Sequence, residues 1–169
     1  MTQRTDALGE AFDPAGAEWT TVSPALATMR RTIAVAVAVV IVLLTAGPAM
    51  FAGAPAFAGG ALIVIAAVVA LVWRLIGRGH RAWGYTERAD DLLVRRGVAF
   101  RKLVVVPYGR MQFVDVSAGP LQRAFGLATV QLHTAAAATD ARIPGLPPAE
   151  AARLRDRLAA RGESRSAGL

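Results

Sequence analysis

The side chains in this sequence that are best suited to chemistry are cations, and several of them stand in pairs. The arginine guanidinium group binds phosphate through two parallel hydrogen bonds, and alternate residues of adjacent strands share one face of a sheet. An anion-binding patch could therefore form from Arg95, Arg96, Arg101, Lys102, Arg110 and Arg123. The competing interpretation, which fits most charge runs, is that these cations only keep sheet surfaces and edges solvated.

Residues for catalysis or metal binding are sparse. The chain has no Cys and two His, His80 and His133, which excludes thiolate chemistry and a multi-His metal site. Asp115 has no partner carboxylate at a useful spacing, and the serines lie in tails and turns. Residues 119–126 lack the repeated glycines and the Lys-Ser/Thr pair of a phosphate loop, so we expect a turn with Leu121 and Phe125 packed inward. We predict a protein that is not an enzyme, with no cofactor and no metal.

The elements that hold these cations follow a long uncharged segment. No charged residue lies between Arg31 and Arg74. A helix of about 20 apolar residues crosses a bilayer, and this segment is about twice as long. Gly47-Pro48 and Pro55 interrupt its middle, where such residues mark a turn. We predict a transmembrane helical hairpin over residues 30–77, with spans at about 32–52 and 57–76.

Basic residues stand at both edges of this hairpin, whereas its central loop is uncharged. The predicted membrane-edge anchors are Arg30, Arg31, Arg74, Arg78, Arg81 and Trp83. Because Lys and Arg are retained on the cytoplasmic side, we expect a multi-pass protein of the plasma membrane with both termini in the cytoplasm. The spans carry no charge that could form an ion or proton path, which argues against a transporter.

The net charge of +7 belongs to residues 78–169, because the basic and acidic residues before them balance. A basic domain tethered to a bilayer faces anionic headgroups, and each nearby Lys or Arg contributes about 1 kcal/mol of attraction. The lipid bilayer is therefore the expected partner of this charge, and nucleic acid is not expected.

Short β-like segments fill residues 83–143, and Gly97 lies near the bend of one hairpin. In the alternating segment 111–116 we expect Met111, Phe113 and Val116 to point inward. A helix with Ala151, Leu154 and Leu158 on one face closes the pattern. The predicted domains are a flexible cytoplasmic tail at 1–29, the hairpin at 30–77, a β domain with a C-terminal helix at 78–161, and a disordered tail at 162–169.

Three stretches carry a family resemblance: residues 92–98 (Leu-Leu-Val-Arg-Arg-Gly-Val), residues 106–116 (Val-Pro-Tyr-Gly-Arg-Met-Gln-Phe-Val-Asp-Val) and residues 119–128 (Gly-Pro-Leu-Gln-Arg-Ala-Phe-Gly-Leu-Ala), followed by His-Thr-Ala at 133–135. They resemble the YdbS-like bacterial pleckstrin-homology (PH) family, over about residues 17–160. Gly109 departs from the Glu or Ser common there, which predicts a looser turn. The resemblance implies a two-helix transmembrane hairpin followed by an α+β PH-like domain, an antiparallel β-barrel or sandwich capped by a C-terminal helix. It also implies no established enzymatic role, and it assigns no binding residues.

Two functions remain open at this stage. The first is a membrane-anchored interaction module at the cytoplasmic face that acts with another membrane protein, which the resemblance suggests is a larger relative with several PH-like domains. The alternative is a sensor or binder of anionic lipid headgroups that uses the basic face. An enzyme or transporter is the least supported, for want of catalytic groups and intramembrane charge.

Overall fold

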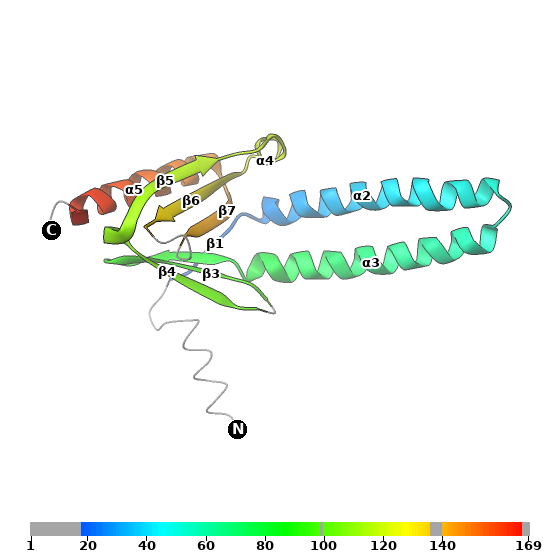
Figure 1. Cartoon of the computed structure of the whole chain (residues 1–169), viewed down its shortest axis with the longest axis horizontal. Helices are drawn as coiled ribbons and strands as arrows, with labels where there is room; N and C mark the ends of the chain where they lie inside the picture. The colour runs from blue at the N-terminus through cyan, green and yellow to red at the C-terminus, as the bar shows by residue number, and fades with distance from the viewer. Residues whose placement is uncertain (1–17, 99, 136–139, 167–169) are drawn as a thin grey trace, which may run out of the picture. The chain divides into compact units, whose positions relative to one another are not determined.

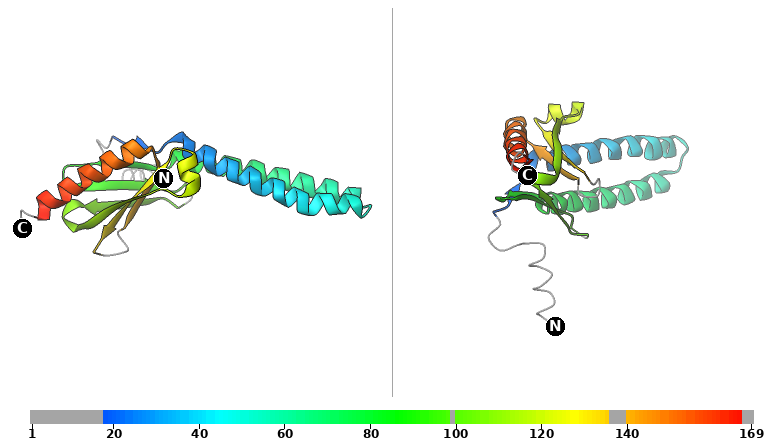
Figure 2. Two further views of the ribbon diagram at one scale, coloured as in Figure 1. Left: turned by 90° about the horizontal axis from the view of Figure 1, so that it is seen from above. Right: turned by 60° about the vertical axis from the view of Figure 1, so that its left-hand side comes forward.

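We describe a computed structural model of the chain, over residues 18–98, 100–135 and 140–166. The chain divides into two compact units (Figures 1 and 2). One unit comprises residues 27–78. The other comprises the chain up to Leu26 together with the chain from Gly79 onward, and we call it the module. Each unit is described by itself below.

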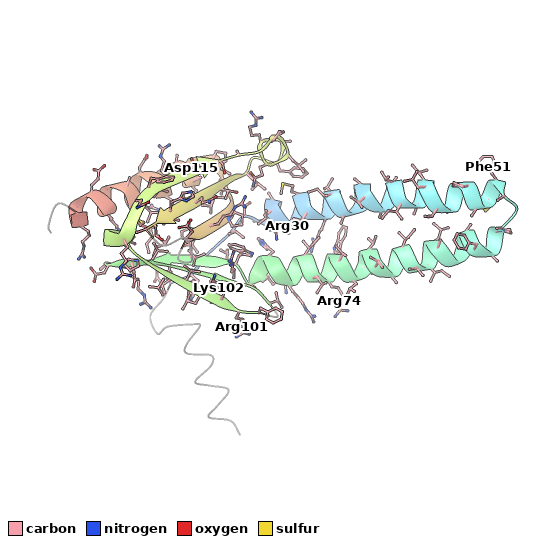
Figure 3. All side chains as sticks on the ribbon, in the orientation of Figure 1. Arg30, Phe51, Arg74, Arg101, Lys102 and Asp115 are labelled. Atoms are coloured by element: carbon pink, nitrogen blue, oxygen red, sulfur yellow. The ribbon has the colours of Figure 1, made fainter. Side chains whose placement is uncertain are left out.

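The first unit is a hairpin made of most of two apolar helices, α2 (Pro24–Phe51, 28 residues) and α3 (Pro55–Arg81, 27 residues). The outermost turn of each helix, up to Leu26 and from Gly79, belongs to the module. Each helix is long and apolar enough to cross a membrane, and only 11% and 6% of their most apolar windows are buried. Helices in the core of a soluble protein are mostly buried, whereas large side chains such as Leu44, Ile63 and Leu71 are exposed here. Phe51 marks the loop end of the hairpin in Figure 3. The predicted spans and turn agree with these helices.

Small residues let the two helices approach each other near that loop. Ala46 and Ala49 of α2 and Ala58 of α3 are buried in one cluster, against which Val42 packs. An alanine side chain loses little conformational entropy when it is packed, and its small size lets two helix backbones come close, which is how helices associate in lipid. Pro48 lies inside α2 without breaking it, and its carbonyl accepts a hydrogen bond from the Ala52 amide at 2.9 Å.

The module is built from two antiparallel sheets. Sheet A has the strand order β1-β2-β3-β4 and sheet B the order β5-β6-β7. The strands are β1 (Thr20–Thr21), β2 (Gly84–Glu87), β3 (Asp91–Arg96), β4 (Lys102–Pro107), β5 (Met111–Ser117), β6 (Ala128–Thr134) and β7 (Ala141–Leu146). A 3-10 turn η1 (Tyr108–Arg110) joins the sheets, α4 (Pro120–Ala124) joins β5 to β6, and α5 (Pro148–Ser166) ends the described chain. The predicted fold class, including the β3–β4 hairpin with Gly97 at its bend, is confirmed.

The module core lies between the sheets and α5. Leu92 and Val106 of sheet A, and Val130 and Leu132 of sheet B, are each 0% exposed. Helix α5 begins after Pro147 with Glu150 in its first turn, where an acidic residue complements the helix dipole. Its predicted apolar face is confirmed, because Ala151, Leu154 and Leu158 are fully buried.

The predicted boundaries of the tails are wrong at both described ends. Residues 20–29 are not a flexible tail: Thr20–Thr21 is a strand, and α2 begins at Pro24. At the other end, α5 continues to Ser166 rather than stopping near residue 160. Arginines of its last turns bind groups of the β2–β3 turn and of η1, as described below, which holds this added length of helix against the module. The predictions for residues 1–17 and 167–169 lie outside the described residues.

The membrane hairpin is inserted between two paired strands of the module. Strand β1 precedes α2 and strand β2 follows α3, yet Thr20 pairs with Tyr85 and Thr21 with Gly84. Val22 and Leu26 are 1% exposed, and the Ser23 amide donates to the Gly145 carbonyl at 2.9 Å. The module is therefore discontinuous in sequence, and a fragment of residues 78–161 would lack part of its core.

Two predicted side-chain orientations are also wrong. Phe113 is 56% exposed, because a register irregularity between Met111 and Phe113 shifts the alternation of β5 by one residue. Val114 and Val116 are the half-buried side chains after this bulge. A bulge of this kind re-aims every following side chain. In α4, Leu121 is 45% exposed, and the buried residue of this connection is Leu127, just after the helix.

Candidate functional site

The strand register shows which cations share one end of the module. Gly84, which follows α3, pairs with Thr21 on one side and with Arg95 on the other. The β3–β4 hairpin turns at the same end, where Arg96 lies opposite Lys102. We call this the exit end, because the chain leaves the module here for α2 and returns here from α3.

Sheet B reaches the exit end through its connection between β5 and β6. Leu146 pairs with Ala128, and Gly145 contacts the segment before α2 through the Ser23 amide. Ser117 pairs with Thr129, so α4 lies between two strand ends at this same edge. The exposed Leu121 and Arg123 of α4 therefore belong to the exit end.

The six predicted anion-binding residues thus divide among three places. Arg96, Arg101, Lys102 and Arg123 lie at the exit end, where Figure 3 labels Arg101 and Lys102 next to each other. Arg95 lies on the opposite face of sheet A from Arg96, because neighbouring residues of a strand alternate. Arg110 lies in η1, beside the far strand ends where Asp91 pairs with Pro107. A single patch of all six cations is therefore not formed.

Arg95 is held by an aromatic partner that sequence reasoning did not assign. Its guanidinium carbon lies 4.2 Å from the centroid of the Trp19 ring, a cation–π contact. Trp19 also lies over Gly84, since a Cβ placed on that glycine would be 3.4 Å from the ring. Trp19 therefore covers the outer face of sheet A. The run of β-branched residues Thr20-Thr21-Val22 was the signal that could have predicted the strand next to it.

The loop between β3 and β4 differs from the other cationic surfaces. Arg96, Arg101 and Lys102 are exposed, and among the described residues they form no ion pair. Between them stand two exposed apolar side chains, Val98 at 45% and Phe100 at 92%. We call Arg96, Val98, Phe100, Arg101 and Lys102 the basic tip. The basic tip thus places two exposed apolar side chains between cationic ones at the exit end.

The arginines of α5 are occupied within the module. Arg157 contacts Glu87 at 2.9 Å and Glu150 at 3.4 Å, and Arg165 pairs with Asp90. Arg161 donates to the Tyr108 hydroxyl at 2.7 Å and to the Arg88 carbonyl at 3.1 Å. The Tyr108 hydroxyl in turn donates to that carbonyl at 3.1 Å. These contacts bind α5 to β2, to the β2–β3 turn and to η1, so three of the five arginines of α5 have a structural role.

This network predicts an alkaline weakening of the module. Burial, together with the carboxylates of Glu150 and Glu87, raises the pKa of Tyr85 to about 12, and burial raises the pKa of Tyr108 above its usual value. A pKa that is higher in the folded state gives stability that is complete below about pH 10 and is lost as the pH rises further. The Tyr85→Phe variant should therefore lose less stability than wild type between about pH 10 and 12. Denaturant unfolding between about pH 10 and 12 measures these stabilities, with tyrosinate absorbance as a second readout and Tyr108→Phe as the comparison variant. If the stability of Tyr85→Phe and that of wild type fell in parallel with pH, the prediction would be wrong.

The predicted membrane-edge anchors lie at the open end of the helical hairpin and just beyond it. Within the hairpin, the Arg31 guanidinium lies 4.9 Å from the Trp73 ring centroid and close to Gly77, so it bridges α2 and α3. Arg74, Arg78 and Arg81 are exposed on the last turns of α3, and Trp83 is half-buried two residues after α3 ends. Their placement suits the edge of an apolar layer, where long basic side chains and Trp are favoured.

No metal-binding cluster appears in the part of the chain that the structure describes. It contains no group of three His, Asp or Glu side chains that could hold a metal ion. His133 lies 3.3 Å from Asp140, and its ring stacks on Phe113 with centroids 4.3 Å apart. Asp140 also accepts from the Thr134 amide at 2.9 Å. These contacts hold the start of β5 and the end of β6 together.

Comparison with known proteins shows which family this chain belongs to. The family model described as "Bacterial PH domain" matches residues 23–162, which include both apolar helices and most of the module. The UPF0699 transmembrane protein YdbS of Bacillus subtilis (strain 168) is 40% identical over 79 residues, covering 47% of this chain and 48% of that protein. The aligned part thus spans about half the length of that relative. No solved structure gives a significant match. The chain belongs to the bacterial PH-domain family, among membrane proteins that resemble YdbS.

Proposed function

We propose that this protein is a non-enzymatic interaction module, held at the cytoplasmic face of the plasma membrane by its helical hairpin, that binds another membrane protein. The basic residues at both edges of the hairpin and its uncharged loop support cytoplasmic termini. The pairing of β1 with β2 supports an even number of crossings, because two strands can pair only when they lie on the same side of a bilayer.

The observation that carries the partner proposal is the edge strand β5. Its backbone pairs with β6 on one side only, and Asp115 is its one charged residue. Helix α5 contacts β5 near Met111, but the strand contains no Lys or Pro, the residues that commonly protect an edge from pairing with a strand of another chain. Phe113 stands exposed on this strand and stacks on His133, which fixes the ring for contact. The proposed partner therefore presents an extended, apolar segment, as a related PH-like domain can.

The anionic bilayer is the second contact in this proposal. The division of the six cations among three places does not favour one headgroup pocket that includes Arg95 and Arg110. The exit end supports a lipid contact by Arg96, Arg101, Lys102 and Arg123, which lie where the chain joins the apolar helices. This surface contact adds to the anchoring by the hairpin and does not involve β5, which remains the proposed site for the protein partner.

Site-directed crosslinking in native membranes tests the partner. Because the chain has no Cys, Phe113→Cys gives a single attachment point for a crosslinker, and Asp156→Cys on exposed α5 gives a matched control. We expect one defined membrane-protein adduct at position 113 and none at 156. With that protein purified, Phe113→Ser should weaken binding about 30-fold or more, as expected for an aromatic hot spot. Equal adducts at both positions, or unchanged affinity of Phe113→Ser, would contradict the proposal.

A further inference from the structure

We propose that the basic tip dips into the bilayer surface, so that Phe100 and Val98 enter the interface while Arg96, Arg101 and Lys102 bind lipid phosphates. This inference rests on the membrane anchoring in the proposed function, but it does not depend on the protein partner. It assigns two apolar residues to a membrane contact that charge alone does not predict.

The first argument is the exposure of the tip. Phe100 is 92% exposed and Val98 45% exposed, although both are apolar. Phe100 is the most exposed large apolar side chain of the module, within its described residues. An aromatic ring with flanking cations suits the headgroup layer, where rings and Lys or Arg side chains are enriched.

The second argument is reach. Arg74, the first charge after the apolar segment, is separated from Arg81 at the end of α3 by about seven residues, a helical rise of about 10 Å. On the other helix, residues between Ser23 and Arg31 give about 12 Å. The headgroup layer on each side of a bilayer is about 5–7 Å thick. Each link is therefore about twice as long as that layer is thick, and the covalent chain limits how far the exit end can lie from the apolar segment.

The third argument is that the base of the tip is well held. The ladder between β3 and β4 continues without a break from Asp91 opposite Pro107 to Arg96 opposite Lys102. The chain then turns at Gly97, whose φ of +95° is available to glycine and strained for other residues. The continuous ladder therefore holds both ends of the tip, at Arg96 and Lys102, in a defined register.

The fourth argument is that the cations of the basic tip are not paired with acidic side chains, within the described residues. The arginines of α5 pair with acids of the module, and Arg95 stacks on Trp19. Arg96, Arg101 and Lys102 have no ion pair among the described residues. Arg96 and Lys102 are cross-strand neighbours, and like charges directly opposite each other repel. A phosphate between them would remove that repulsion, so the anionic bilayer surface is the occupant that fits.

A depth measurement on the full-length protein tests this inference. Phe100→Cys and the control Gln112→Cys, on exposed β5, carry one environment-sensitive dye each in lipid nanodiscs that contain only this protein. In anionic discs of phosphatidylglycerol and phosphatidylcholine, we expect the dye at position 100 to be quenched by brominated lipids and shielded from iodide. The dye at position 112 should show the reverse. Adding Arg96→Ala, Arg101→Ala or Lys102→Ala should weaken insertion about fivefold each.

Two results would overturn the inference. Equal iodide quenching at positions 100 and 112 in anionic discs would show that the tip stays in water. Unchanged insertion in discs of phosphatidylcholine alone, or after all three cations are replaced, would remove the phosphate contact. Because no protein partner is present, either failure leaves the crosslinking result at Phe113 to be judged separately. Conversely, loss of the adduct at position 113 would not alter the dye measurement.

Discussion

Replacement of Leu26 by Ala should lower the free energy of unfolding of the module by about 2–5 kcal/mol, the range for removing a buried leucine side chain. Leu26 is 1% exposed although it lies in the first turn of α2, far from the rest of the module in sequence. Its side chain fills the space beside Gly145, where an added Cβ would lie 2.8 Å from Leu26 atoms. Glycine is required at position 145 by its φ of +74° as well, so the site is not expected to collapse around the cavity.

Pulse proteolysis in urea on the full-length protein in nanodiscs measures this loss, since cleavage reports unfolding of the module outside the bilayer. Leu121→Ala is the matched control, because Leu121 is 45% exposed on α4, and its replacement should change stability by less than about 0.5 kcal/mol. If Leu26→Ala and Leu121→Ala behaved alike, the segment before the hairpin would not belong to the module core.

Gly97→Ala should be nearly as damaging, and it should also displace the basic tip. A Cβ at this glycine would lie 1.9 Å from the Phe100 carbonyl oxygen and 3.0 Å from its carbonyl carbon, both of them backbone atoms. A side chain at φ +95° adds strain of about 1–3 kcal/mol. Because the backbone must move to remove the overlap, we expect a destabilisation above that range and loss of lipid quenching at position 100.

Gly126→Ala separates strain from overlap. Gly126 also has a positive φ, of +62°, but a Cβ there would have no neighbour within 4 Å. Its replacement should cost only the left-handed backbone penalty, about 1–2 kcal/mol. Urea unfolding of the two variants side by side gives the comparison. Equal losses for Gly97→Ala and Gly126→Ala would show that the β3–β4 turn relaxes freely, and would weaken the case for a well-held tip.

The parts of the fold that sequence predicted are those with strong local patterns. An uncharged run twice the length of a span leaves few alternatives to a helical hairpin, and Pro55 with its neighbours places the turn. The same holds for α5, whose apolar face at Ala151, Leu154 and Leu158 repeats with helical spacing. The turn at Gly97 was predictable because a glycine between two strand-like segments commonly marks a turn.

The sequence-based predictions are wrong where the position of a residue depends on segments that are distant in the sequence. Strand β1 has two residues, too few for any periodicity, and its partner Tyr85 comes after both membrane helices. The bulge beside Phe113 depends on the register against β6, which no local pattern specifies. The scatter of the six cations follows from the same cause. Arg110 and Lys102 are close in sequence, but β4 carries them to opposite ends of the module.

The pairing of β1 with β2 across the inserted hairpin also constrains biosynthesis. Leu26 leaves the ribosome about 120 residues before Gly145, the backbone against which it packs. At ordinary rates of about 5–20 residues per second, that delay is about 6–24 s. During this time both apolar helices are made and inserted, while the first strand waits without its neighbours. The module can therefore reach its final form only after both apolar helices have been synthesised, and until then the first strand has no partner strand.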